Sequence, residues 1–326
     1  MGGVRGVSVK LGQLLFVLWA VATILFFIFR LMPGDPLTAF IEPTFTQAER
    51  DELSRQFGLD LPLFQQYLLY LLNLVQLNLG KSFFYRQDVA TLVWEVFPNT
   101  IVLTLAALIV AYVIGIVLGA TLAWKRNSVL EKIALPVVLM LRAAPEFWLG
   151  MVLLAVFSFS LGWLPSGGTL EAGTERGSFL THMFNRDFRA HLFLPAATLA
   201  LYLVGLPVLL MRSTMLEVLN EDFVTLARMQ GFSERTIMLR HAARNALLPV
   251  ATAFTLGIGY SVGGNVVIET VFSWPGLGRL LVKAVQAHDY PLAQGAFMLI
   301  AVVTIAMNGL AELLYRLLDP RVDHVG

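Results

Sequence analysis

The chain has few residues that could perform catalysis. It contains no cysteine, which excludes a thiolate metal site, an iron–sulfur cluster, a disulfide and a cysteine nucleophile. Its histidines show no spacing typical of metal ligands, such as His-Glu-x-x-His, and no Gly-x-Ser-x-Gly sequence would expose a nucleophilic serine. The sequence therefore predicts no catalytic residue, no metal site and no cofactor bound by this chain.

One short segment resembles part of a nucleotide-binding loop. Gly80-Lys81-Ser82 matches the end of the pattern G-x-x-x-x-G-K-[ST], but Val75 stands where the first glycine is required. We interpret the match as chance, and we expect no ATP hydrolysis on this chain.

Three polar residues recur every four positions in an apolar segment: Ser261, Asn265 and Glu269. This spacing predicts that they share one face of a helix. An ionisable group inside a membrane helix is a functional candidate, so these residues are candidates for lining a hydrated substrate path. The alternative is that Glu269 lies at the outer interface while Asn265 hydrogen-bonds to a neighbouring helix.

A second polar group lies around Pro145. Arg142 and Glu146 are four residues apart, which is the spacing of an ion pair on one helix face. The simplest interpretation is a salt bridge at a helix that the proline kinks. A role as a gate is the alternative.

These residues lie in a chain that is mostly apolar. Hydrophobic residues make up 57% of the 326 residues and charged residues only 14%, whereas soluble proteins have about 45–50% and 25%. The formal net charge of +1 excludes a strongly basic nucleic-acid-binding protein. Six segments are long enough to cross a bilayer, namely 11–29, 100–124, 133–164, 192–211, 246–268 and 292–310. The sequence predicts an all-α membrane protein with six transmembrane helices, because a lipid-exposed backbone must satisfy its own hydrogen bonds.

Lysine and arginine indicate the orientation. They are denser in the segments 1–10, 125–132, 212–245 and 312–326 than in the segments between them. The positive-inside rule then places both termini in the cytoplasm and residues 33–99 in a large extracytoplasmic loop. Within that loop, Pro62 and several amide side chains favour helices packed on the outer membrane face over a seventh span across residues 59–79.

The cytoplasmic segment 212–245 has the pattern of two helices joined by a glycine turn. Asn220 is the expected N-cap of the first helix, and Gly231 stands where a C′ glycine would end it. A second helix is expected over residues 236–247. The first helix carries apolar side chains that a solvated loop would not need, at Phe223, Leu226, Ala227 and Met229. We interpret this segment as a docking element.

Residues 220–235 and 240–249 resemble the cytoplasmic loop of binding-protein-dependent ABC importer permeases, and more narrowly the first permease of the dipeptide/oligopeptide/nickel group. Further blocks agree in order and spacing, including Leu-Met-Pro-Gly-Asp-Pro at 31–36, Asp-Tyr-Pro at 289–291 and Leu-Asp-Pro-Arg at 318–321. The resemblance covers essentially the whole chain. One departure is that the Glu-Ala-Ala signature of the wider superfamily reads here as Thr225-Leu226-Ala227, which argues against the sugar-type permeases.

The resemblance implies that residues 221–230 form a coupling helix that inserts into a groove of an ATP-hydrolysing subunit. Phe223, Leu226 and Ala227 would pack into that groove. Asp222 and Arg228 would make polar contacts, and Gly231 would supply the turn. The implied domains are an N-terminal span with its outer loop (1–99), the core permease domain with coupling loop 212–245 (100–318) and a cytoplasmic tail (319–326).

The resemblance also implies partners and a function. They are a homologous second permease, two ATP-binding subunits that hold ATP and Mg, and an extracytoplasmic solute-binding protein, all at the bacterial inner membrane. The expected solute is a short peptide, with nickel chelates, glutathione or glycopeptides as alternatives. A secondary transporter or a channel is the alternative from another class, but the sequence shows no inverted repeat.

Overall fold

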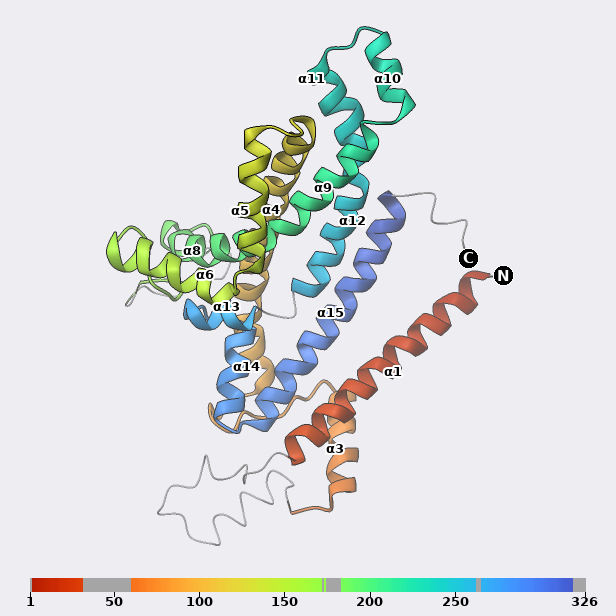
Figure 1. Ribbon diagram of the computed structural model, residues 1–326. Coiled ribbons are helices and arrows are strands. Elements are labelled where there is room, and N and C mark those ends of the chain that lie inside the picture. Colours follow the sequence, from red (N-terminus) through yellow and green to blue (C-terminus); the bar gives the residue numbers. More distant parts are fainter. Residues whose placement is uncertain (1, 32–59, 172, 174–182, 262–264, 319–326) are drawn as a thin grey trace. The chain divides into compact units, whose positions relative to one another are not determined.

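The computed structural model describes residues 2–31, 60–171, 173, 183–261 and 265–318 (Figure 1). These residues are mostly helical, and their only β geometry is an isolated bridge between Lys81 and Asp88. The all-α membrane fold predicted from the sequence is therefore confirmed. The chain divides into two compact units, residues 1–99 with 275–305 (unit 1) and residues 100–274 with 306–326 (unit 2).

The expected functional division at residues 99 and 318 stays a prediction. By packing, residues 275–305 group with the N-terminal part of the chain rather than with the core. The tail 319–326 lies outside the described residues.

Unit 1 is built on two long helices that continue into unit 2. Its helices are α1 (Gly2–Leu31), α3 (Leu63–Val75), the first part of α4 (Val89–Trp124), α14 (Leu277–Gln286) and the first part of α15 (Tyr290–Leu318). Their buried core includes Phe29, Val93, Leu281, Tyr290 and Leu292. Helix α14 buries one face because its apolar residues recur at helical spacing, from Leu277 to Leu281 and Ala284.

Helix α3 lies beside α1 (Figure 1). The Tyr67 hydroxyl is 2.8 Å from Thr23 Oγ1, and the Tyr67 ring packs edge-on against Phe26 at 5.3 Å. Helix α3 has 13 residues, whereas a membrane span needs about 20. This length agrees with the interpretation of residues 59–79 as a short helix and not a seventh span. Its place on the outer membrane face stays a prediction.

Asp289 ties the turn before α4 to the start of α15. Its carboxylate is fully buried and accepts hydrogen bonds from Ser82 Oγ at 2.5 Å and from the backbone N–H groups of Phe83 and Phe84 at 3.1 and 3.0 Å. Gly80, with φ +77°, begins this turn. The Gly80-Lys81-Ser82 triplet thus lies in a turn that starts no helix before Val89, whereas a phosphate-binding loop leads directly into one.

Unit 2 contains the rest of α4, the end of α15 and the helices from α5 to α13. They are α5 (Val129–Ala143), α6 (Glu146–Leu153), the π-helix η1 (Leu154–Ser160), α8 (Arg186–Leu203), α9 (Gly205–Val218), α12 (Ala243–Ser261) and α13 (Val266–Val271), with three shorter elements between α9 and α12. Helices α4 and α9 pack closely because Gly115 and Gly119 have no side chain. A Cβ atom at Gly115 would lie 2.6 Å from Pro207, and one at Gly119 would lie 2.6 Å from the Val208 carbonyl.

The count of six spans is not confirmed. Among the described residues, three helices are long and apolar enough to cross a membrane: Gly12–Leu31, Val89–Trp124 and Tyr290–Leu310. Two further spans are possible as bent pairs, α5 with α6–η1 at 106° and α8 with α9 at 41°. The predicted fifth span, residues 246–268, is not one helix, because α12 ends at Ser261 and α13 begins at Val266.

Candidate functional site

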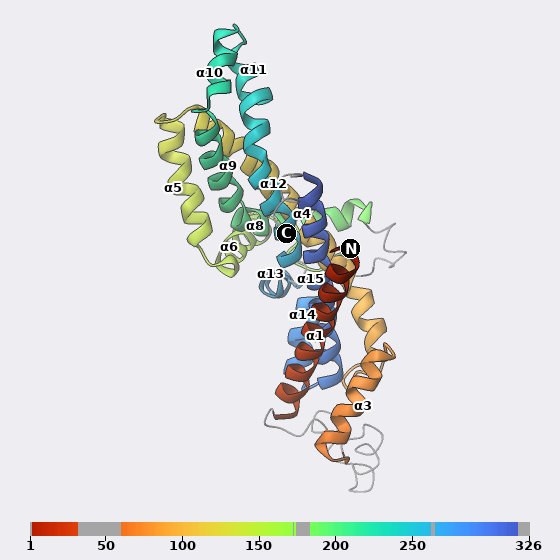
Figure 2. The same cartoon turned by 90° about the vertical axis from the view of Figure 1, so that its right-hand side faces the viewer.

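The helix–glycine turn–helix predicted within 212–245 is present. It consists of α10 (Asp222–Met229), the single turn α11 (Glu234–Thr236) and the π-helix η2 (Ile237–Ala242), which runs on into α12. Figures 1 and 2 both show α10 and α11 beyond the ends of α9 and α12, at one end of unit 2. The expected helix over residues 221–230 corresponds to α10 with its two caps.

Gly231 ends α10 in a Schellman motif. Its φ is +81°, its N–H donates to the Arg228 carbonyl at 3.0 Å, and the Phe232 N–H donates to the Ala227 carbonyl at 3.3 Å. Glycine adopts this left-handed conformation without the cost that a Cβ adds. The predicted N-cap was wrong by one residue: Glu221 is the N-cap, and the Asn220 side chain donates to the Leu216 carbonyl of α9 instead.

Helix α10 has an inward and an outward apolar face. Val224 and Ala227 are buried and pack with Ile237, Trp124 and Leu219 of the same chain. The outward face carries the exposed apolar side chains of Phe223 (38% exposed), Leu226 (55%) and Met229 (79%), which we call the outer stripe. Ala227 was expected to pack into a partner's groove, but at 100° per residue it lies on the inward face with Val224. The apolar surface that remains available is the outer stripe.

The charged residues of α10 lie near its ends. Asp222 is in the first turn, where a carboxylate interacts favourably with the helix dipole. Arg228 Nε lies 3.4 Å from Glu234 Oε1 across the glycine turn. Both side chains are exposed, so this ion pair contributes at most about 1 kcal/mol.

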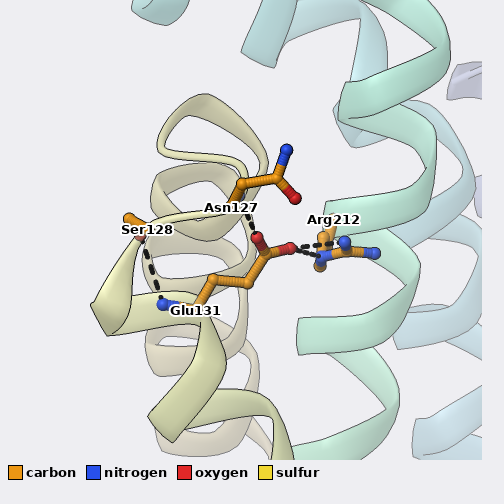
Figure 3. A network of polar contacts seen from close by, with 4 residues as sticks. All are labelled: Asn127, Ser128, Glu131 and Arg212. Carbon is orange, nitrogen blue, oxygen red and sulfur yellow. Dashed lines mark hydrogen bonds and ion pairs between the residues drawn. The ribbon is translucent and has the colours of Figure 1, made fainter.

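A buried ion pair braces the helix that leads to α10 (Figure 3). Glu131 Oε1 accepts hydrogen bonds from Nε of Arg212 on α9, at 2.8 Å, and from its Nη2. Glu131 Oε2 accepts from the Asn127 backbone N–H at 2.5 Å, and Ser128 caps α5 by accepting from the Glu131 N–H at 3.3 Å. The Glu131 side chain is 7% exposed and that of Arg212 25%. Three donors, two of them from a guanidinium, therefore stabilise the ionised carboxylate where little water reaches it.

This ion pair was not predicted from the sequence. Ser128-x-x-Glu131 has the capping-box spacing and predicts a helix start at this place. Its partner Arg212 is 81 residues further along the chain, a pairing that no local pattern specifies.

Asn265 and Glu269 both contact α4. Thr100 Oγ1 donates to Glu269 Oε1 at 2.7 Å, and Asn265 Nδ2 donates to Thr104 Oγ1 at 3.1 Å. Glu269 is fully buried. The prediction of one continuous helical face was wrong, because Asn265 has non-helical backbone angles (φ −88°, ψ 69°) and separates α12 from α13. Ser261 is the last residue of α12, and its side chain lies outside the described part of the structure.

Pro145 lies at the sharp bend between α5 and α6. Ala144 before it is extended (φ −69°, ψ 137°), as expected for a residue that precedes proline, so α5 ends at Ala143 and Glu146 starts α6. Since the bend of 106° separates the two helices, Arg142 and Glu146 do not share a helix face, and no ion pair joins these two described residues. The predicted salt bridge was wrong. Arg142 packs against Gly205 instead, because a Cβ atom added at Gly205 would lie only 3.0 Å from Arg142 Cβ.

Histidines form no metal centre in the described residues. His191 Nδ1 lies 3.0 Å from Asp187 Oδ1 within the same helix, and the His241 ring lies 5.3 Å from that of Phe232. No group of three or more histidine, aspartate or glutamate side chains in the described ranges could hold an ion together.

Comparisons with known proteins agree along the whole chain. Residues 7–104 match the family described as "Binding-prot-dependent transport system membrane comp, N-term", and residues 115–324 match "Binding-protein-dependent transport system inner membrane component". The chain is 38% identical to the di/tripeptide transport system permease protein DppB of Pseudomonas aeruginosa, over 97% of each chain. It is 37% identical to the oligopeptide transport system permease protein AppB of Bacillus subtilis, over 94% of this chain and 96% of AppB.

A solved structure shows the same fold. It is an inward-facing conformation of the MetNI methionine ABC transporter, with a TM-score of 0.56 and 16% sequence identity over 71% of this chain and 97% of that one. The family matches, the two full-length relatives and this fold lead to one assignment. The chain belongs to the binding-protein-dependent transport system inner membrane components and is a multi-pass permease subunit of an ABC importer.

Proposed function

We propose that this chain is the first of two permease subunits in an importer of short peptides. The observation that carries the proposal is the similarity to DppB and AppB, which covers nearly the full length of all three chains. Both relatives are named for peptide transport. Nickel chelates, glutathione and glycopeptides are the competing solutes, and no contact among the described residues favours any of them. The family assignment gives no support to a secondary transporter or a channel.

The outer stripe of α10 is the proposed contact with an ATP-binding subunit. Burying a side chain the size of leucine or methionine contributes about 1.5–3 kcal/mol, so the three exposed side chains Phe223, Leu226 and Met229 can hold the helix in a groove. Asp222 and Arg228 flank the stripe and are the proposed polar contacts. The two ATP-binding subunits bind ATP and Mg, and their closure moves α10.

The brace between Glu131 and Arg212 supports this coupling. Arg212 lies on α9, the helix that leads into α10, and Glu131 lies at the start of α5. A guanidinium held by two hydrogen bonds to one carboxylate has a fixed orientation. A displacement of α10 is therefore transmitted through α9 to α5, because the ion pair allows little relative motion between α9 and α5.

The remaining assignments are proposals carried over from the sequence. Six crossings, with both termini in the cytoplasm, would place residues 33–99 outside, where the solute-binding protein docks. The second permease would complete the path between the two subunits. Ser261, Asn265 and Glu269 stay the proposed path residues, and the bend at Arg142, Pro145 and Glu146 stays the proposed gate.

Uptake in a strain that lacks the gene tests the substrate class. We expect the full importer, with this chain restored, to accumulate labelled di-, tri- or oligopeptides, and unlabelled peptides to compete. A catalytically dead ATP-binding subunit serves as the control and should abolish accumulation. Restored uptake of nickel or glutathione without peptide uptake would contradict the peptide assignment, and uptake with the dead subunit would contradict the coupled mechanism.

A further inference from the structure

Unit 1 contains a cavity that shares no lining residue with the coupling surface or with the proposed path. Its volume is about 550 Å³. The lining comes from the end of α1, from α3, from residues 78–83 and from the start of α15, all of which belong to unit 1. Small-molecule sites have volumes of about 300–1,000 Å³, so the cavity is large enough for a ligand.

Two cations line this cavity without a carboxylate partner. Within the described residues, neither Arg30 nor Lys81 takes part in an ion pair, and the guanidinium of Arg30 lies over the Phe26 ring, 5.6 Å from its centroid. Arg30 is partly buried. A guanidinium that has lost part of its water is stabilised by an anion, and its planar donors match the oxygens of a phosphate or a carboxylate.

Several neutral side chains that line the cavity can donate hydrogen bonds. The Tyr70 hydroxyl is buried and has no hydrogen-bond partner among the described residues. Buried hydroxyls normally have one, so this group indicates that an acceptor is missing. The amides of Asn73, Asn78 and Gln294 line the same space. Asn78 Oδ1 already accepts from the Gly80 N–H, which leaves its NH₂ group to donate.

The surroundings of the cavity are apolar in the way of a lipid-facing surface. Arg30 lies in the last turn of α1, a candidate membrane span. Next to it, Ile28 is 54% and Leu31 74% exposed, and on α3 Phe64 is 69% exposed. A cationic cavity beside the end of a membrane helix, with apolar side chains around it, lies where lipid headgroups meet their acyl chains.

We propose that this cavity binds the phosphate headgroup of an anionic phospholipid. Arg30 and Lys81 neutralise the phosphate, and the Tyr70 hydroxyl with the amides of Asn73 and Asn78 donates to its oxygens. The exposed side chains of α1 and α3 contact the acyl chains. A free phosphate ion would use the same donors but not this apolar surface, which favours the lipid.

Lipid binding to the purified, delipidated importer complex tests the proposal. The probes are phosphatidylglycerol and, for comparison, phosphatidylcholine, and bound lipid is counted by native mass spectrometry. We expect phosphatidylglycerol to bind more tightly than phosphatidylcholine. The double variant R30Q/K81Q should weaken the binding of phosphatidylglycerol by about tenfold or more, since charge-assisted hydrogen bonds are lost. Lys283→Gln is the matched control, because Lys283 is exposed on α14 of the same unit but does not line this cavity.

Two further variants separate the cavity from general effects on folding. Asn73→Trp keeps both cations and should exclude the headgroup by filling the space, whereas Arg30→Lys keeps the charge and should retain most of the binding. Equal affinity for the two lipids, or unchanged binding in both R30Q/K81Q and Asn73→Trp, would overturn the proposal. Displacement of the lipid by excess inorganic phosphate or by a transported peptide would assign the cavity to a soluble anion and would also overturn it.

Discussion

Single residues in this permease hold helices together through buried polar contacts. The Glu131–Arg212 pair joins α5 to α9, and Asp289 joins the turn at residues 80–88 to α15. In each case a carboxylate with little exposure accepts several hydrogen bonds. The sequence shows that these residues are polar, but it does not predict which residues they contact. Pairing depends on which helices become neighbours, whereas local patterns act over a few residues.

The Glu131–Arg212 brace predicts a measurable coupling energy. Arg212→Gln removes the positive charge and leaves the Glu131 carboxylate without its ion-pair partner, so it should lower the thermal stability of the permease. The double variant E131Q/R212Q should lose less than the sum of the two single variants, because it leaves no unpaired charge. Thermal unfolding of the purified complex measures both. Arg244→Gln, at an exposed position on α12, is the control, and additive losses in the double variant would contradict the brace.

Glu269 can serve the substrate path or join α13 to α4, and one variant separates these two roles. Glu269→Gln keeps a carbonyl oxygen that can accept from Thr100 but removes the charge. If the charge serves the substrate path, peptide uptake should change while the thermal stability and the assembly of the complex stay close to those of the wild type. Lower stability with normal uptake per assembled complex would show instead that Glu269 holds α13 to α4.

Among the elements, α10 was the best predicted and the interrupted helices the least. Its acidic start, its apolar positions and Gly231 are local signals, and they agree with the observed helix and its Schellman motif. The burial of Ala227 and the breaks at Ala144 and Asn265 depend on neighbouring helices. Hydropathy reports how apolar a segment is but not where its backbone bends.

We expect an aspartate substitution to have different effects on the outward and inward faces of α10. Met229→Asp changes a side chain that is 79% exposed, so the permease should fold normally but lose its ATP-binding subunits. Val224→Asp, on the same helix, buries an unpaired carboxylate and should destabilise the permease itself. Co-purification of the ATP-binding subunits and thermal unfolding distinguish the two outcomes. Normal co-purification with Met229→Asp would remove the outer stripe from the interface.

Substitutions at Gly231 test whether coupling depends on the left-handed backbone conformation of this turn. No atom lies within 4 Å of the position a Cβ would take, so a substitution is limited by the backbone alone. Gly231→Leu should cost about 1–2 kcal/mol in the left-handed conformation and should lower the ATP hydrolysis that loaded solute-binding protein stimulates. Gly231→Asn, a residue that tolerates this conformation, should stay close to the wild type. Unaltered stimulation in the leucine variant would disprove the coupling role of this turn.

At the scale of the whole molecule, the sequence predicts the fold class more firmly than the membrane topology. The apolar composition and the length of the apolar segments together predict an all-α membrane protein. The number of crossings does not follow from composition, because a bent pair of helices can cross once or return to the same side. The structure has three unbroken candidate spans and two bent pairs in its described part.

Because the chain contains no cysteine, single cysteines can report the topology directly. Gln87, Arg126 and Thr225 are exposed and lie in different segments between candidate spans. If both termini are cytoplasmic and there are six crossings, a membrane-impermeant maleimide added to spheroplasts should label Gln87→Cys but neither Arg126→Cys nor Thr225→Cys. Inside-out vesicles should give the reverse pattern. Three crossings separate residue 87 from residue 225 in this arrangement, so labelling of both from the same side would mean that one of the bent pairs does not cross the membrane.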